Sequence, residues 1–427
     1  MINKPLNNYP LLLGVVPVLA LLCVAVLNYT IDPYRIFSSN KNALYSNYAA
    51  LHPNLRLHKA YQINQQKPDT IILGTSKAIQ GVPLEHAYFS GKAVYNLAAP
   101  LASMREIYHL LLHAQSNQPL KEVVFVVDFL SFNVLARADG PAAGYVEDRL
   151  KTETSSSAYW PDYLAATVSA DALKASIAVL RPEASSSHRV LNGLGGRQDQ
   201  EIASRLSDGG HRSNSQKIER FFIDSVLLAA PHRRFAMSSE HDDSLLWFER
   251  FVDAAQQMDI KTTLIVGPSH TRYWELLHQG GLWPLFEQWK SALVSINHKV
   301  AVEHNKPELP LWDFTLPNAI TSEVFPASKD SETKMQYYYE AVHFNQHTGG
   351  LMLDRISGQE VDGLPENFGV VLNESSLLQL NARLANGLAQ FRDQSPGSVE
   401  ELLMSIPESV LRTTTTTVPL AAENDID

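Results

Sequence analysis

Cysteine is nearly absent from this chain of 427 residues, since Cys23 is the only one. This excludes an intrachain disulfide, a CxxC redox pair and a cysteine zinc site. Basic residues are outnumbered, with 35 Lys and Arg against 45 Asp and Glu and a formal net charge of -10, so we expect no nucleic-acid partner. Internal repeats are also missing. With 45% hydrophobic and 19% charged residues, the composition is typical of a globular protein and excludes wholesale disorder.

One long apolar run stands near the amino terminus. Residues 11–29 read LLLGVVPVLALLCVAVLNY and carry no charge, and a helix of this length crosses the hydrocarbon of a bilayer. Lys4 precedes the run, and the first charges after it are Asp32 and Arg35, which places residues 1–10 in the cytoplasm. We therefore predict an uncleaved single-pass anchor with the bulk of the chain exported. The alternatives are a cleaved signal peptide, disfavoured by the run's length and the missing cleavage site, and a buried core helix, disfavoured by its length and position.

Short apolar segments bounded by polar, Pro or Gly residues predict five strands, at residues 70–73, 93–97, 122–127, 262–266 and 310–314. Helical periodicity predicts helices between them, at residues 103–114, 244–258 and 282–296. Continuously apolar strands that alternate with helices are typical of a parallel sheet covered on both faces, so we predict an α/β fold. Ligands of such folds bind beyond the carboxyl ends of the strands.

The segments outside this alternation give the predicted domain boundaries. Residues 30–67 read as a linker that leads into an α/β domain over residues 68–394. Residues 151–215 read as an insertion with two SSS runs, GLGG and DGG, in which one helix fits residues 163–180. We expect the rest of the insertion to be a lid, a binding loop or a mobile excursion. Residues 395–427 read as a short helix and an acidic low-complexity tail, which we expect to be disordered.

A serine, a histidine and a carboxylate are placed for nucleophilic catalysis. Ser76 follows the first predicted strand in the run Gly-Thr-Ser-Lys, so its hydroxyl faces the edge where ligands bind. The hydroxyl needs a base, and the base needs an acceptor on its other ring nitrogen. His343 is the candidate base, Glu340 three residues earlier is the candidate orienter, and Asp313 after the fifth strand is a second one. Each signal alone is common in turns and on helix surfaces, but together they favour a catalytic pair across one cleft.

These residues resemble the motifs of the SGNH/GDSL hydrolase superfamily, over roughly residues 68–355. The likeness is closest to its membrane-anchored bacterial branch, which includes exported proteins of alginate acetylation and of lipoteichoic-acid D-alanylation. The family's first block, G-[DTS]-S, is matched by residues 74–76, and its last block, D-x-x-H, is matched with Glu in place of Asp by Glu340 and His343. Its second block has a glycine where Leu101 stands. Its third block has an asparagine, for which Asn133 is a displaced candidate.

The resemblance implies a three-layer α/β/α sandwich of flavodoxin-like type with about five parallel strands. It implies a serine acyltransferase or esterase that works through a seryl ester, without cofactor or metal, with the N–H groups at Ser76 and Leu101 and the Asn133 side chain as oxyanion candidates. It places the chain in a bacterial inner membrane, with its bulk in the periplasm or outside the cell. The implied partners are a glycopolymer acceptor and a multipass membrane acyltransferase.

Other readings stay open. A non-catalytic protein of the same fold would bind glycan or scaffold an envelope complex. A metal-dependent hydrolase would use the spacing of Glu340, His343 and His347 to hold zinc. After the fourth predicted strand, the loop GPSHTRYWE offers candidates for binding an acceptor sugar by stacking and charge, although packing in the core is an equal alternative. These candidates are His270, Arg272 and Trp274.

Overall fold

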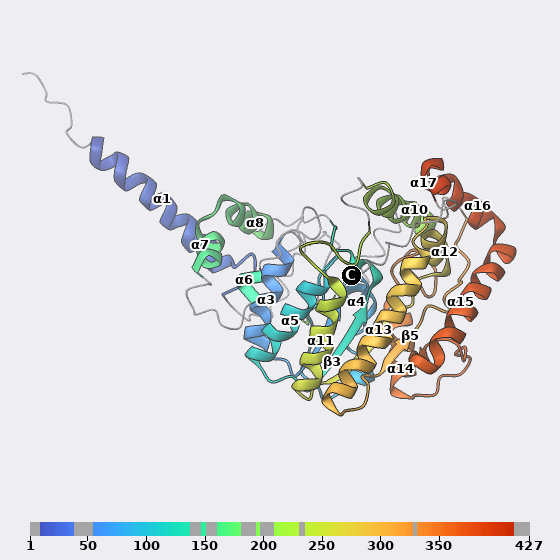
Figure 1. The fold of residues 1–427 in the computed structure, drawn as a ribbon. Coiled ribbons are helices and arrows are strands. Elements are labelled where there is room, and N and C mark those ends of the chain that lie inside the picture. Colours follow the sequence, from blue (N-terminus) through green and yellow to red (C-terminus); the bar gives the residue numbers. More distant parts are fainter. Residues whose placement is uncertain are drawn as a thin grey trace, which may run out of the picture.

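The computed structural model describes residues 9–37, 54–136, 147–150, 160–180, 194–196, 209–229, 235–327, 330 and 332–413. Within these ranges the chain forms a six-stranded sheet in the order β2-β1-β3-β4-β5-β6 (Figure 1). β1 to β5 are parallel, and β6 pairs antiparallel with β5. The strands are β1 (Thr70–Gly74), β2 (Val94–Asn96), β3 (Glu122–Val127), β4 (Lys261–Val266), β5 (Leu311–Asp313) and β6 (Val370–Val371). The predicted α/β class and its five parallel strands are confirmed.

Alternate side chains of the central strands divide between two hydrophobic clusters, one for each face of the sheet. Phe125 and Val127 of β3 belong to the first cluster, and Val124 and Val126 belong to the second. The first cluster includes side chains of α3 (Leu55–Gln66), α5 (Met104–Asn117), α11 (Ser244–Gln257) and α13 (Trp283–His304). The second includes side chains of α4 (Ser76–Gly81) and α14 (Gln346–Ser357). Burial on both sides explains why the strands are continuously apolar.

The other described helices lie mostly in connections and at the carboxyl-terminal end. They are α6 (Glu147–Leu150), α7 (Trp160–Val168), α8 (Ala170–Leu180), α10 (Gly210–Phe222), α12 (Thr271–Gln279), α15 (Glu374–Gln394), α16 (Pro396–Ser405) and α17 (Glu408–Thr413). Short 3-10 helices η3 (Ala87–Phe89) and η4 (Phe129–Phe132) and the single π-helical segment η8 (Ile223–Leu227) complete the set.

Two of the predicted boundaries are wrong in part. α3 belongs to the body and not to a linker, because its Leu57, Ala60 and Ile63 are buried in the first cluster. The short helix predicted at the start of residues 395–427 is confirmed as α16, which buries Leu402 completely, and α17 follows it, so the expected disorder does not hold for residues 396–413. Where one helix was predicted over residues 163–180, the described part of the insertion has two, α7 and α8, which are bent by 57° relative to each other. Residues 38–53, 151–159, 181–193, 197–208 and 414–427 lie outside the described residues.

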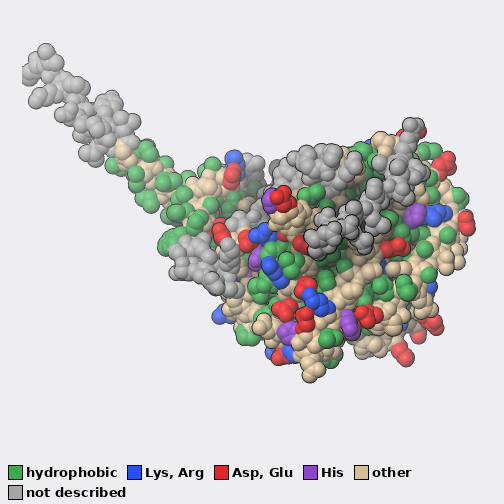
Figure 2. All heavy atoms as spheres, viewed as in Figure 1, with side chains coloured by type: hydrophobic (Ala, Val, Ile, Leu, Met, Phe, Trp, Pro, Cys, Tyr) green, Lys and Arg blue, Asp and Glu red, His purple; other side chains and the backbone are tan. Residues whose placement is uncertain are grey.

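The helix α1 (Tyr9–Ile31) projects away from the body in Figure 1. Its segment Gly14–Ile31 has a mean hydropathy of 2.2 and is only 11% buried. It is therefore long and apolar enough to cross a membrane, as predicted for residues 11–29. Figure 2 shows hydrophobic side chains along the described part of α1 and onto the body where α1 joins it.

Candidate active site

The nucleophile candidate lies in a tight turn between β1 and α4. Gly74 has φ +139, and a Cβ there would lie 2.6 Å from the carbonyl oxygen of Val126, so the turn requires glycine. Thr75 follows and caps α4. Ser76 is the first residue of α4 and is partly exposed. A first helical residue has an N–H that the helix itself leaves without an acceptor, so both the hydroxyl and the N–H of Ser76 are available at the sheet edge.

The histidine and carboxylate lie on a short loop and not on a helix. Tyr338 and Phe344 form an antiparallel bridge, and within it the N–H of Tyr339 donates to the carbonyl of His343 at 3.0 Å. This closure brings Glu340 Oε1 into hydrogen-bonding contact with His343 Nδ1. The other carboxylate oxygen accepts the N–H of Val342 at 2.7 Å. Glu340 is only 2% exposed, so its carboxylate is held in one orientation by groups of its own loop.

The structure brings the three predicted residues together. Ser76 Oγ lies 2.8 Å from His343 Nε2, although the two residues are 267 positions apart in the chain. The order of contacts is hydroxyl, imidazole, carboxylate, which is the arrangement that lets an imidazole take the proton of a serine. A carboxylate on Nδ1 keeps the proton on that nitrogen and leaves Nε2 free to accept.

Two glycines allow α14 to approach α4 and so carry His343 to Ser76. A Cβ on Gly349 would lie 1.7 Å from the carbonyl oxygen of Gly81. A Cβ on Gly81 would lie 2.1 Å from the ring of Phe344. The first turn of α14 begins at the N-cap Asn345, two residues after the histidine, and its side chain accepts the N–H of Thr348 at 3.0 Å. The backbones of the two helices therefore touch next to the candidate site.

Leu101, an oxyanion candidate, lies in the turn after β2. It has φ +50, a left-handed conformation that costs a residue with a Cβ roughly 1–2 kcal/mol. Its N–H donates to no acceptor within the described ranges. The N–H of Ala99 donates to Gly74 O at 3.1 Å, which ties this turn to the nucleophile turn. Arg56 Nη2 donates to the carbonyl of Pro100 at 2.7 Å, which holds the turn from the other side.

Asn133, the third oxyanion candidate, ends the short helix η4 that follows β3. It is buried after η4, and its Oδ1 accepts the N–H of Leu135 at 3.1 Å and of Ala236 at 3.2 Å. Within the described residues no hydrogen bond joins it to Ser76 or His343. The amide oxygen of Asn133 therefore holds two backbone N–H groups of the neighbouring loops, and only its Nδ2 group could donate to an oxyanion, so the role of Asn133 stays a prediction.

A buried ion pair lies beneath the nucleophile turn. Lys77 Nζ is 3.1 Å from Asp128 Oδ1, and Thr75 Oγ1 donates to Asp128 Oδ2 at 2.8 Å. The lysine also lies 5.0 Å from the ring centre of Tyr273. Burial alone would raise the pKa of Asp128, but the Lys77 charge and the hydrogen bonds from Thr75 and Lys77 outweigh it and lower the pKa. Sequence analysis assigned no role to Lys77, although it stands next to Ser76.

The three residues predicted to bind sugar are buried instead. His270, Arg272 and Trp274 are 1%, 3% and 2% exposed, because α12 begins at Thr271 and packs them inward. Burial lowers the pKa of His270 to about 4, so this imidazole is neutral near pH 7. The backbone N–H of His270 donates to Ala341 O at 2.9 Å and so supports the loop that holds Glu340. Of the two alternatives for these residues, packing in the core is confirmed and sugar binding is contradicted by their burial; they support the candidate site instead.

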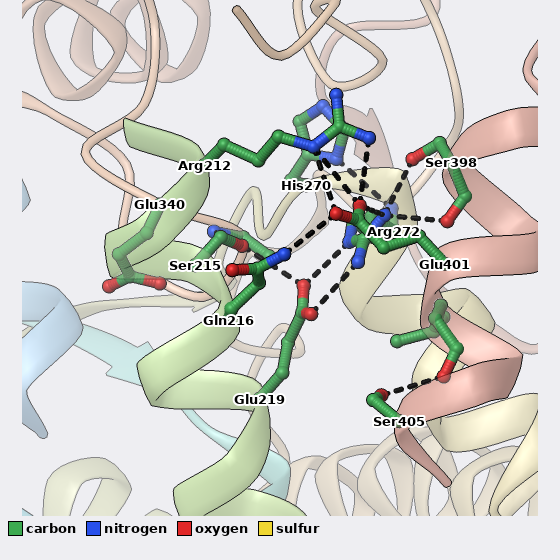
Figure 3. A network of polar contacts seen from close by, with 12 residues as sticks. Arg212, Ser215, Gln216, Glu219, His270, Arg272, Glu340, Ser398, Glu401 and Ser405 are labelled. Atoms are coloured by element: carbon green, nitrogen blue, oxygen red, sulfur yellow. Dashed lines mark hydrogen bonds and ion pairs between the residues drawn. The ribbon is translucent and has the colours of Figure 1, made fainter. Parts of the chain in front are cut away.

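Arg272 lies at the centre of a polar network between α10, α12 and α16 (Figure 3). Its Nε and Nη2 bind the carboxylate of Glu219 at 2.6 and 3.0 Å, and its Nη1 donates to Ser398 O at 2.6 Å. Both charged partners are almost fully buried. The pair therefore satisfies charges that would be costly to bury alone.

The same network reaches the histidine loop and the carboxyl-terminal helices. Ser215 donates to Glu219 at 3.0 Å and accepts the N–H of Ala341 at 3.2 Å. Arg212 Nη2 binds Glu401 of α16 at 2.9 Å. In Figure 3 Glu340 lies beside Ser215 at the edge of the network. These supporting contacts could not be predicted from the sequence, because no local pattern indicates contacts between residues more than a hundred positions apart.

Two further alternatives from the sequence were Asp313 as a second orienter of His343 and a zinc site at Glu340, His343 and His347. Asp313 is not an orienter of His343, because it is fully buried in an ion pair with Lys290 at 2.6 Å and its Oδ1 accepts from Thr315. His347 stacks on the ring of Tyr337. Across the part of the chain that the structure describes, no group of three or more His, Cys, Asp and Glu side chains is placed to hold a metal ion.

The arrangement can activate a serine hydroxyl and place backbone N–H groups near the reacting carbonyl. Comparisons with protein-family models, with curated proteins and with solved structures find no match to this chain. The functional conclusion therefore depends on the geometry of the site.

Proposed function

We propose that this chain is a membrane-anchored serine acyltransferase or esterase of the SGNH type, acting on an envelope or secreted glycopolymer. The observation that carries the proposal is the 2.8 Å contact between Ser76 Oγ and His343 Nε2, with Glu340 on the other ring nitrogen. The two hydrophobic clusters on the two faces of the sheet support the proposed three-layer α/β/α arrangement. The apolar α1 supports the proposed single-pass anchor, and a bacterial inner membrane with the body in the periplasm is part of the same proposal.

In the proposed reaction, Ser76 Oγ attacks the carbonyl carbon of a bound ester while His343 Nε2 takes the hydroxyl proton. The carbonyl oxygen gains the negative charge, and the N–H groups of Ser76 and Leu101 stabilise it. His343 then gives its proton to the leaving oxygen, which leaves an acyl group on Ser76. Water or a sugar hydroxyl then attacks this seryl ester and passes its proton to His343. His343 gives that proton to Ser76 Oγ as the acyl–oxygen bond breaks, which restores the serine hydroxyl and the neutral imidazole. Glu340 orients the ring and stabilises its positive form in both steps.

The left-handed turn at Leu101 supports this oxyanion assignment. The SGNH type uses a glycine at this point, and here a leucine takes a conformation that favours glycine. The strain is retained where a free N–H is needed, and retained strain is common at functional sites. Asp128 lies beneath the nucleophile turn, where an unpaired carboxylate would repel an oxyanion, but its ion pair with Lys77 neutralises this charge.

Labelling of the full-length protein in detergent with a fluorophosphonate tests the proposal. We expect the wild type and the control Ser291→Ala, on α13, to be labelled, and Ser76→Ala to lose the label. His343→Gln should lower the labelling rate by several orders of magnitude, because the hydroxyl loses its base. A wild type that folds but takes no label would refute catalysis and favour the non-catalytic glycan-binding or scaffolding protein. With a labelled ester, release of acid without acceptor or transfer to added polysaccharide distinguishes esterase from transferase.

A further inference from the structure

The helices α7 and α8 follow each other with a bend of 57° and are called the α7–α8 hairpin below. They carry exposed apolar side chains that the proposed reaction does not use. Trp160 and Leu164 on α7 are 63% and 55% exposed, and Ile177 and Leu180 on α8 are 41% and 57% exposed. The exposed stripe of α8 runs from Asp171 and Lys174 at its beginning to these two apolar residues at its end. Both helices of the pair thus expose apolar side chains, with the charged Asp171 and Lys174 close to the bend between them. Exposed apolar side chains, a tryptophan among them, beside charged ones are typical of a segment at a membrane surface.

This hairpin packs against the end of α1 that follows the apolar run. Asn28 of α1 is fully buried and donates to Thr167 O of α7 at 2.8 Å, and it accepts from Ser176 Oγ of α8 at 2.8 Å. Figure 1 shows α7 and α8 beside this end of α1. Because a single buried asparagine bridges both helices, the depth of α1 in a bilayer fixes the depth of the hairpin.

The length of α1 sets that depth. The 18 residues of Gly14–Ile31 span about 27 Å as a helix, against a hydrocarbon thickness of about 30 Å. The last turns of α1, where Asn28 lies, must therefore reach the boundary between hydrocarbon and headgroups. The hairpin lies at the same level. Its aromatic neighbours are those found at this level in membrane proteins, with Tyr29 and Phe37 in contact at 5.0 Å and Phe37 stacked on Tyr163 at 5.5 Å.

We propose that the α7–α8 hairpin lies in the bilayer interface, with Trp160, Leu164, Ile177 and Leu180 in contact with lipid, and that it holds the body at a fixed orientation to the membrane. The occupant of this apolar surface is lipid, because the surface continues that of α1. The inference requires α1 to be the anchor and does not require catalysis. The hairpin does not cross the bilayer, since it is bent by 57° and its Asp162 is bound to Arg149 at 2.6 Å and to Tyr61 of α3 at 3.1 Å.

The attachment to the body makes the orientation rigid. Arg149 of α6 binds both oxygens of Asp162, at 2.6 and 2.7 Å. Tyr61 of α3 reaches the same carboxylate, and α3 in turn donates from Lys59 to Ala98 O at 2.6 Å, in the turn that carries Leu101. A chain of polar contacts therefore runs from the membrane-facing hairpin to the candidate oxyanion turn.

Fluorescence quenching of the full-length protein in phosphatidylcholine vesicles tests the proposal. Cys23 is the only cysteine, so Cys23→Ser combined with Leu164→Cys or Leu180→Cys gives single sites for an environment-sensitive dye. Native Cys23 on α1 is the reference for lipid, and Val302→Cys on α13, at a site 65% exposed, is the reference for water. We expect dyes at 164 and 180 to be quenched by nitroxide lipids and to be several-fold less quenched by iodide than the dye at 302.

Three results would overturn the inference, given circular dichroism that shows a folded protein. Quenching of positions 164 and 180 by iodide to the level of position 302 would place the hairpin in water. Protection from both quenchers would assign the surface to a second copy or another protein. A dye on Cys23 that lipid does not quench would remove α1 from the bilayer. Fluorophosphonate labelling of Ser76 in the same vesicles reports separately on the proposed catalysis.

Discussion

Replacement of Gly349 by alanine should separate α14 from α4 and break the contact between Ser76 and His343. The added Cβ would lie 1.7 Å from the carbonyl oxygen of Gly81, and real Cβ contacts do not fall below 3.0 Å, so the helices must move apart by about 1.3 Å. The same movement would stretch the 2.8 Å hydrogen bond beyond its range. A displacement of about 1 Å lowers rates by about a hundredfold, which is the loss of fluorophosphonate labelling that we expect.

The neighbouring glycine is a matched control for this experiment. A Cβ on Gly350 would lie 3.5 Å from its nearest neighbour, the ring of His86, which is ordinary contact. Alanine favours a helix over glycine by about 1 kcal/mol, so Gly350→Ala should keep or raise the melting temperature and keep the labelling rate. Gly349→Ala should lose about 1–3 kcal/mol from overpacking despite the same gain. Equal melting temperatures and equal labelling rates for the two variants would refute the role assigned to this contact.

Three more substitutions test other parts of the site. Lys77→Met should destabilise the protein by about 3–5 kcal/mol at pH 7, because it leaves Asp128 charged and buried. In the wild type the pKa of Asp128 is lowered, so this carboxylate stabilises the fold above the ordinary carboxyl pKa, and the stability is lost as the pH falls through the lowered value. In the variant the Lys77 charge is gone, and burial raises the pKa of Asp128. The difference in melting temperature between variant and wild type should therefore shrink as the pH falls and the carboxylate is protonated. A constant deficit from pH 7 to pH 4 would contradict this. Leu101→Gly should keep labelling and raise stability by up to about 1 kcal/mol, since it relieves the left-handed leucine, and a loss of folding in a thermal melt would show that the leucine side chain matters more than its backbone. Ser215→Ala should lower the free energy of unfolding by about 1–3 kcal/mol and slow labelling, because the N–H of Ala341 loses its acceptor. An unchanged labelling rate would show that α10 does not support the loop that carries His343.

The strands and the main helices could be predicted because each has a local pattern. Residues 122–127 were predicted to the residue as β3, and Ser103 accepts the N–H of Glu106 as a cap should. β6 has only two residues and no periodicity to read. α3 reads as polar because it contains His58 and Lys59, yet both are buried, the lysine donating to two backbone carbonyls. Long-range hydrogen bonds made these residues compatible with a core, and no window of sequence contains them.

In the candidate site, too, residues with a local pattern could be predicted and residues set by long-range contacts could not. Ser76, Glu340 and His343 could be found from their places after a strand and before a helix, and the structure joins them. The sequence left open whether the residues after the fourth strand bind sugar or pack in the core, because the buried partner of Arg272, Glu219, is 53 positions away. Asn133 was chosen as a displaced candidate after the third strand, and neither its type nor its place reveals that two backbone N–H groups bind its oxygen. Partners distant in sequence decide which polar residues face a ligand.

The separation of 267 positions between hydroxyl and imidazole has a consequence for biosynthesis. Ribosomes deliver the serine long before the loop with the histidine and before α16, which reaches that loop through Glu401 and α10. Under the proposed function, the serine hydroxyl therefore lacks its base for most of synthesis. The proposed acylation could begin only after the chain has folded around both residues, which for an exported protein means after translocation.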